Sequence, residues 1–137
     1  MKVVVDVGAS IPTRAHKKTD AGLDLCSTKS GWILPKCRKV FGTGVHVEIP
    51  TGFVGMLTSK SGLMLKGITS RGTIDQGHTG EIKAVLFNHS WVPVRIKKGQ
   101  KITQLVLMRI AIPELDFVEK LGETERADGG FGSTGKF

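Results

Sequence analysis

The sequence has no long apolar run and few cysteines, so we expect neither a membrane anchor, nor a leader segment, nor a cysteine framework. No apolar run in its 137 residues approaches the roughly 18 residues that a membrane-spanning helix needs. Only three valines separate Lys2 from Asp6 near the start, too few for a leader core. Cys26 and Cys37 lie outside any CxxC or Cys/His ligand spacing, which favours reduced thiols over a disulfide or a zinc site. We therefore expect a cytoplasmic protein with no membrane partner.

The sequence is also poor in aromatic residues and in helical periodicity. Aromatic side chains make up only 6% of it, whereas glycine is abundant at 18 residues. Short apolar segments separated by Gly or Pro recur along the chain, and none keeps helical spacing for about ten residues. This pattern predicts an all-β sandwich or jelly-roll-like barrel in one domain, residues 1–121, followed by a flexible glycine-rich arm, residues 122–137.

Acidic residues are outnumbered, so the formal net charge is +8 and the isoelectric point is near 9.8. Such a charge would suit a polyanionic partner, and nucleic acid is the first candidate. The basic residues, however, occur in short clusters without interleaved aromatic side chains: Arg14, Lys17 and Lys18, and Lys36, Arg38 and Lys39. We expect a solvated basic surface that attracts phosphates, and no direct binding of nucleic acid.

Residues 69–88 organise the rest of the chain. Two β-rich arms flank a turn that contains Asp75, Gly77, His78 and Gly80, which predicts a β-hairpin with a carboxylate at the turn. A carboxylate beside a glycine-opened backbone could activate water, while the arms offer N–H and C=O groups to a flat ligand. The alternative is a loop tip with a solvated aspartate.

Two other segments carry candidate site residues on strands. Leu23 and Leu25 alternate with acids and a glycine, which predicts a strand over residues 19–25 with Asp24 on the opposite face. That face could admit a hydrated cation, or it could be a surface with solvated acids. The longest strand candidate is residues 100–110, where Gln104 stands among apolar residues and is either a satisfied sheet amide or a ligand-facing one.

A short helical turn is predicted after residues 53–57, a buried strand candidate. Ser61 can cap its start and Gly67 can end it. Free backbone N–H groups at the start, beside the charge of Lys60, would form a phosphate seat. An ordinary turn with a surface lysine is the alternative. The glycine-rich arm adds Arg126 for a phosphate grip, Phe131 for stacking, and hydroxyl donors.

Taken in order, five segments between residues 19 and 135 resemble the motifs of the homotrimeric dUTP pyrophosphatase (dUTPase) family. They are residues 21–25 (AGLDL), 59–63 (SKSGL), 72–80 (GTIDQGHTG), 99–105 (GQKITQL) and 126–135 (RADGGFGSTG). One such motif would be weak, but five in register over most of the chain are specific. The resemblance implies that family's distorted jelly-roll, a homotrimer with active sites at subunit interfaces, and an arm that closes the site.

The resemblance also implies a reaction and its residues. dUTP would be hydrolysed to dUMP and pyrophosphate, which limits uracil in DNA and supplies dUMP for dTMP synthesis. Asp75 would deprotonate the water that attacks the α-phosphorus, and Asp24 would hold Mg²⁺ through coordinated water. The implied substrate-binding residues are Lys60, Ser61, Gly62, Thr69, Thr73, Ile74, His78, Lys83, Gln104, Arg126, Phe131, Gly132, Ser133 and Thr134. Phe131 would stack on uracil.

Base choice follows from hydrogen bonding in the hairpin. Uracil presents an acceptor, a donor and an acceptor, which backbone groups around Thr69, Thr73, Ile74 and Lys83 could match. Cytosine inverts part of that edge, and each buried mismatch costs about 1–3 kcal/mol. A thymine methyl group would be refused by lack of space.

Three residues depart from the family pattern. Lys60 stands where Arg is usual, so the phosphate site lacks a planar guanidinium group that could bind phosphate through two hydrogen bonds. His78 takes the place of a Tyr that packs under deoxyribose, so rejection of UTP is weakened. Thr69 stands where an Asn often helps to read the base. The catalytic and metal-holding aspartates are retained, so we expect an active enzyme.

Two alternatives share this fold. In the related dCTP deaminases the catalytic Glu aligns with Val85, an apolar residue that cannot shuttle protons, so deamination is disfavoured. The second is a regulatory protein in which the nucleotide acts as a conformational switch, which is what a resemblance to some phage members of the family implies. A viral source would place the protein in the host cytoplasm.

Overall fold

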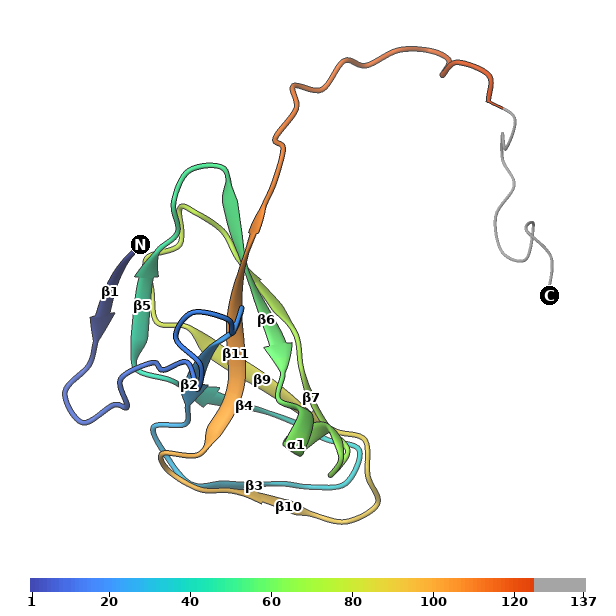
Figure 1. The fold of residues 1–137 in the computed structure, drawn as a ribbon. Coiled ribbons are helices and arrows are strands. Elements are labelled where there is room, and N and C mark those ends of the chain that lie inside the picture. Colours follow the sequence, from blue (N-terminus) through green and yellow to red (C-terminus); the bar gives the residue numbers. More distant parts are fainter. Residues whose placement is uncertain (125–137) are drawn as a thin grey trace.

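A computed structural model describes residues 1–124 of the chain. Strands dominate it and the single helix of this part is short (Figure 1), so the predicted all-β class is confirmed. In chain order the elements are β1 (Lys2–Val5), β2 (Leu23–Cys26), β3 (Gly31–Ile33), β4 (Arg38–Gly42), β5 (Val45–Glu48), β6 (Phe53–Ser59), α1 (Ser61–Met64), β7 (Ile68–Ser70), β8 (Gly72–Ile74), β9 (Lys83–Asn88), β10 (Val94–Ile96) and β11 (Lys101–Arg109).

The strands pair in four small antiparallel sheets. One has the order β2-β11-β6-β8 and another the order β4-β9-β7, while β1 pairs with β5 and β10 pairs with β3. None of the helices in residues 1–124 is long and apolar enough to cross a membrane. The arrangement is that of a distorted jelly-roll, in which short strands change partners at their ends.

Two apolar clusters fill the interior. The first gathers Leu25, Leu57, Ile74 and Leu105, with further valines and isoleucines, beneath the β2-β11-β6-β8 sheet. The second gathers side chains from β3, β4, β7, β9, β10 and β11 with Leu63 of α1. Alternation along the strands sends every second residue into one of these clusters, which is why short strands suffice.

The predicted hairpin of residues 69–88 forms only in part. Its outer arms pair as expected, with Thr69 opposite Phe87. The segment β8 instead leaves β9 and pairs with β6, with Thr73 opposite Met56. The cause is apolar packing, because Ile74 belongs to the first cluster whereas Ile68 belongs to the second. The hairpin therefore forks at Arg71.

Strand β11 is central to the larger sheet. It pairs with β2 on one side and β6 on the other, so Gln104 lies opposite both Asp24 and Thr58. Residues directly opposite in an antiparallel pair project from the same face. This register brings the candidate residues of two separate sequence segments together.

The chain after β11 leaves the body of the fold (Figure 1). Residues 110–124 form no helix or strand, and they carry exposed apolar side chains such as Leu115 and Phe117, the latter 90% exposed. The expected domain boundary at residue 121 remains a prediction, because residues 125–137 lie outside the described part of the chain.

We expect Leu105→Ala to lower the free energy of unfolding by about 2–5 kcal/mol, because it leaves a cavity beneath the central strand. Leu105 is 1% exposed. Urea unfolding at one protein concentration measures the change. Leu65→Ala is the matched control, since Leu65 is 91% exposed and its truncation should cost less than about 0.5 kcal/mol. Equal losses in both variants would contradict the assigned core.

Candidate active site

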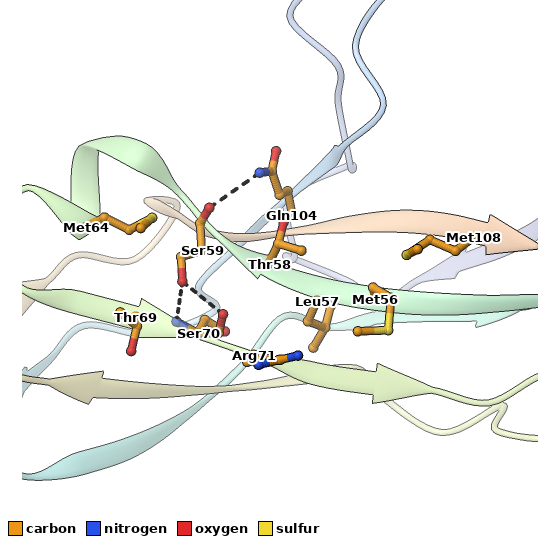
Figure 2. Close-up of a pocket in the computed structure, with 10 residues that line it drawn as sticks. All are labelled: Met56, Leu57, Thr58, Ser59, Met64, Thr69, Ser70, Arg71, Gln104 and Met108. Atoms are coloured by element: carbon orange, nitrogen blue, oxygen red, sulfur yellow. Dashed lines mark hydrogen bonds between the residues drawn. The ribbon is translucent and has the colours of Figure 1, made fainter. Parts of the chain in front are cut away.

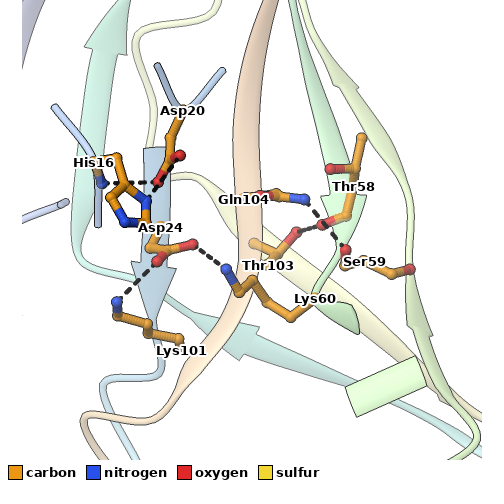
Figure 3. Close-up of polar contacts among 9 residues, drawn as sticks. All are labelled: His16, Asp20, Asp24, Thr58, Ser59, Lys60, Lys101, Thr103 and Gln104. Atoms are coloured by element: carbon orange, nitrogen blue, oxygen red, sulfur yellow. Dashed lines mark hydrogen bonds and ion pairs between the residues drawn. The ribbon is translucent and has the colours of Figure 1, made fainter. Parts of the chain in front are cut away.

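Asp24 is a buried carboxylate held by two lysines. The residue is 5% exposed. Its Oδ1 accepts a hydrogen bond from Lys60 Nζ at 2.5 Å, and its Oδ2 accepts one from Lys101 Nζ at 2.9 Å (Figure 3). For Asp24 the solvated-acid alternative is therefore wrong, and the strand predicted over residues 19–25 begins only at Leu23. A buried carboxylate needs such partners, because an unpaired charge away from water is costly.

The two lysines decide the protonation of this carboxylate. Burial by itself raises the pKa of Asp24, but the hydrogen bonds from Lys101 and Lys60, and their charges, outweigh burial and hold that pKa below its ordinary value of 3.8. The same contact raises the pKa of Lys101, chiefly through its hydrogen bond to Asp24. At neutral pH the site contains one carboxylate between two ammonium groups.

Gln104 lies beside this ion pair, over Gly22. Its Nε2 donates to the Ser59 carbonyl at 3.4 Å, and a Cβ atom on Gly22 would lie 2.3 Å from Gln104 Oε1. The absence of a Cβ atom on Gly22 leaves room for the Gln104 amide in this position. Together with Asp20, Asp24 and Lys60, these residues line a pocket of about 370 Å³. Gln104 thus both donates within the sheet and lines the pocket, and its role toward a ligand stays a prediction.

The short helix α1 follows Lys60 directly. Lys60, not Ser61, occupies the N-cap position, and no side chain caps the helix, so the predicted Ser61 cap is wrong by one residue. Gly67 does adopt a left-handed conformation just past the helix, with φ of 76°. Ser61 and Gly62 are exposed at its start, and nothing lies within 4 Å of a Cβ placed on Gly62. Backbone there is open to a ligand.

The turn after β8 forms a second pocket. It is lined by Thr73, Ile74, Asp75, His78 and Lys83, with Gly80 and Glu81, and has a volume of about 540 Å³. Asp75 is exposed, and its carboxylate has no hydrogen-bond or ion-pair partner within residues 1–124. Its backbone carbonyl accepts from His78 N at 3.0 Å, which closes the turn. The carboxylate is thus free to take a ligand or a water.

The fork of the hairpin leaves backbone groups unpaired beside this pocket. Strand β8 is the edge of its sheet, and β7 covers β9 only as far as Leu86. In the described chain, therefore, one edge of β8 and the edge of β9 at residues 83–85 are not paired with any strand. Such an opening presents N–H and C=O groups to a flat, hydrogen-bonding ligand.

Thr69 lies in a third place, an apolar groove between β6 and β7 (Figure 2). Three methionines, Met56, Met64 and Met108, line this groove with Thr69 and Gln104. The Thr69 hydroxyl is within 2.7 Å of His89 Nε2, so it is already engaged. Thr69 stands apart from the other residues predicted to read the base.

The predicted residues thus divide into separate groups. Asp24, Lys60 and Gln104 line one pocket, Asp75 and its neighbours line another, and no residue is shared between these two pockets. Five predicted residues, Arg126, Phe131, Gly132, Ser133 and Thr134, lie outside the described part of the chain. Sequence reasoning missed Lys101, although a basic residue at the start of the strand that carries Gln104 was a usable indication.

The oxygen ligands around Asp24 suit a metal ion that arrives bound to the phosphates of a substrate. No group of three or more His, Cys, Asp or Glu side chains in the described chain could hold a metal. One carboxylate beside a pocket could hold Mg²⁺ once Lys60 releases its oxygen, because Mg²⁺ usually keeps several waters and binds through one or two carboxylates plus substrate phosphates. It does not fit a metal held by protein alone.

The chain matches the dUTPase family model over residues 8–135. It is 41% identical to the deoxyuridine 5'-triphosphate nucleotidohydrolase of Nocardia farcinica, covering 96% of this chain and 82% of the relative. It is 44% identical to the protein of that name from Clostridium kluyveri, covering 93% and 91%.

Solved structures give the same result. A dUTPase from Staphylococcus bacteriophage 80alpha, solved with dUpNHpp, superposes with a TM-score of 0.90 at 33% identity over 98% of both chains. A mutant dUTPase from phage phi11 of S. aureus, described as coordinating a structural Mg(II) ion, superposes with a TM-score of 0.80 at 31% identity, covering 87% of this chain and 96% of that one.

We expect Asp24→Asn to lower the free energy of unfolding by about 1–3 kcal/mol at pH 7, because it leaves two lysines without their acceptor. The folded pKa of Asp24 is depressed, so its contribution is present above the unfolded pKa and is lost as pH falls below 3.8. Urea unfolding of both proteins from pH 7 to pH 3 should show the difference shrinking below that value.

Asp116→Asn is the control for this comparison, because Asp116 is exposed and its removal should change the free energy by less than about 0.5 kcal/mol. A difference between the Asp24 variant and the unmodified chain that stays constant down to pH 3 would contradict the ion-pair assignment.

Proposed function

The chain belongs to the dUTPase family, and from that premise we propose that it hydrolyses dUTP to dUMP and pyrophosphate. Such an activity limits uracil incorporation into DNA and supplies dUMP for dTMP synthesis. The observation that carries the proposal is that the chain has both a free carboxylate at a forked hairpin and a polar pocket that contains Asp24, Lys60 and Gln104. The first suits base recognition and water activation, and the second suits a triphosphate.

Asp75 is the proposed general base. Its exposed, unpaired carboxylate stands at the end of β8, next to the unpaired backbone edge of the fork. Uracil bound in the fork would place the attached triphosphate beyond the turn. There Asp75 can take a proton from a water molecule as that water attacks the α-phosphorus. Pyrophosphate is then the leaving group. The reaction depends mainly on holding the water and the phosphorus in line.

The pocket at Asp24 is the proposed phosphate seat. Lys60 and the open backbone of Ser61 and Gly62 would bind phosphate oxygens, and the Gln104 amide would donate from the opposite side. Lys60 would have to exchange its contact with Asp24 for one with phosphate. Mg²⁺, when bound, would neutralise charge on the triphosphate, and Asp24 would hold it through water. Among the residues outside the described chain, Arg126, Gly132, Ser133 and Thr134 would complete the grip, and Phe131 would stack on uracil.

Uracil is proposed to bind in the fork between β8 and β9. The unpaired backbone of Thr73, Ile74 and Lys83 can match its acceptor, donor and acceptor edge, whereas cytosine leaves mismatched partners. His78 lines the same pocket and would lie near the sugar. Thr69 would have to release His89 to take part in base recognition.

We propose further that the protein is a homotrimer whose active sites lie between subunits. In one chain the hairpin pocket and the phosphate seat have no lining residue in common. The segment after β11 carries exposed apolar side chains away from the body of its own subunit, as expected of a segment that packs on a neighbour. Both observations are accounted for if the two pockets meet across an interface.

A nucleotide-controlled switch is the second proposal. Solved phage 80alpha relatives with bound dUpNHpp are described as controlling transfer of virulence genes by a G protein-like mechanism. The switch is compatible with catalysis, since both need the same nucleotide site. Deamination of dCTP is disfavoured, because Val85 projects from the exposed face of β9 opposite Val40 and supplies no proton-transfer group there.

We expect Asp75→Asn to lower kcat for dUTP by at least about a hundredfold, because the amide cannot accept the proton of water. Binding of a non-hydrolysable dUTP analogue should persist. Lys60→Ala should also be inactive, through loss of the phosphate grip. Pyrophosphate release measures both rates. A fully active Asp75→Asn enzyme would contradict the catalytic role.

Mixing the two inactive variants tests whether the site is shared. After co-refolding, hybrid oligomers contain interfaces where an intact Asp75 faces an intact Lys60, so activity should return. Asp75→Asn mixed with Asp75→Ala is the matched control and should stay inactive, because no subunit in that mixture has the Asp75 carboxylate. If the first mixture recovers no activity although hybrids form, the site lies within one chain.

A further inference from the structure

The two tryptophans of the chain are both exposed, each beside a cation, and both belong to the β3–β10 pair or to the loop that leads into it. Trp32 on β3 is 53% exposed, and Trp91 in the loop before β10 is 82% exposed. Lys36 Nζ lies 4.0 Å from the Trp91 ring centroid, and the Arg95 guanidinium carbon lies 5.9 Å from that of Trp32. Arg95 and Trp32 are directly opposite each other in the β3–β10 pair. We call this surface the tryptophan face.

The tryptophan face is strongly basic. Residues 29–39 and 89–98, which supply β3, β10 and the loops next to them, contain seven lysines and arginines and no aspartate or glutamate. Lys29, Lys97 and Lys98 are exposed at the end of the β3–β10 pair where Lys98 N donates to Ser30 Oγ. No ion pair of the described chain neutralises these three lysines. A field of one sign over a surface with exposed aromatic rings favours a polyanion.

The tryptophan face is held in shape by buried polar contacts. Asn88 is fully buried, and its Nδ2 donates to the Ile33 carbonyl at 3.0 Å and to the Val92 carbonyl at 2.8 Å. These bonds tie the loop that carries Trp91 to the strand that carries Trp32. In Figure 1, β3 and β10 lie along the lower edge of the fold, and no other part of the described chain lies below them. The loop and the strand are therefore fixed relative to each other, and both tryptophans are exposed.

We propose that the tryptophan face binds single-stranded nucleic acid. Exposed indoles stack on bases without regard to sequence, and neighbouring lysines and arginines contact the phosphates. The expectation of no nucleic-acid binding rested on basic clusters without aromatic residues among them. The fold removes that objection, because it brings Trp91 to Lys36 across more than 50 residues of sequence. The site uses none of the residues proposed for dUTP.

A membrane surface is the less favoured partner. Indoles that enter a lipid interface need their rings free to face the acyl boundary, with cations around the rim. Here the cations lie over the rings themselves. Rings covered by cations are poorly suited to insertion among acyl chains, whereas a cation and a ring together can stack on a base. Only Leu34 and Val92 add exposed apolar area next to the two tryptophans.

Intrinsic fluorescence reports this surface directly, because the chain has two tryptophans and no tyrosine. Titrating the full-length protein with an oligothymidine of about 20 nucleotides at low salt should quench this fluorescence. Anisotropy of the labelled oligonucleotide should give the affinity. Trp91→Ala should weaken binding about tenfold or more through loss of stacking, with the rate of dUTP hydrolysis unchanged.

Charge variants test whether binding depends on the tryptophan face or only on the net positive charge of the protein. Arg95→Gln with Lys98→Gln should reduce the slope of log affinity against log salt by about 1.4. Lys17→Gln with Lys18→Gln removes the same charge elsewhere and should leave the slope unchanged if the face is the site. Absence of quenching at low salt, equal effects in both double variants, or quenching by anionic phosphatidylserine vesicles but not by the oligonucleotide would overturn the proposal.

Discussion

The register of β11 is the constraint on which the candidate site depends. Because β11 pairs with β2 and β6 at once, Gln104 lies opposite Asp24 and Thr58, and Lys60 follows the end of β6. A slip of one residue would turn Gln104 to the other face of the sheet. Two interactions act against such a slip: Leu105 packs in the first apolar cluster, and Asp24 keeps its two lysine partners only in this register.

The division of the interior into two apolar clusters has a functional consequence. It draws Ile74 toward one cluster and Ile68 toward the other, so the arms of the hairpin separate and leave backbone edges open beside Asp75. A continuous hairpin would have satisfied those backbone groups itself. The opening that we propose for uracil is therefore a result of how the core is packed, and the phosphate seat is a result of strand register. The two pockets have no lining residue in common.

The sequence was informative where alternation and turn residues were clear. It predicted the all-β class, the strand with Gln104, and the outer arms of the hairpin. It could not predict the fork at Arg71, since that depends on which cluster each isoleucine joins. It also left open whether Asp24 is solvated, because the lysines that hold it come from β11 and from the end of β6. The roles of Asp75, Asp24 and the arm residues remain predictions.

The fate of solvent oxygen tests the proposed reaction most directly. Hydrolysis of dUTP by the full chain with Mg²⁺ in ¹⁸O-labelled water should give dUMP and pyrophosphate, with one labelled oxygen in dUMP and none in pyrophosphate, as read by mass spectrometry. Label in the pyrophosphate, release of orthophosphate with dUDP, or absence of turnover would contradict attack of an activated water on the α-phosphorus.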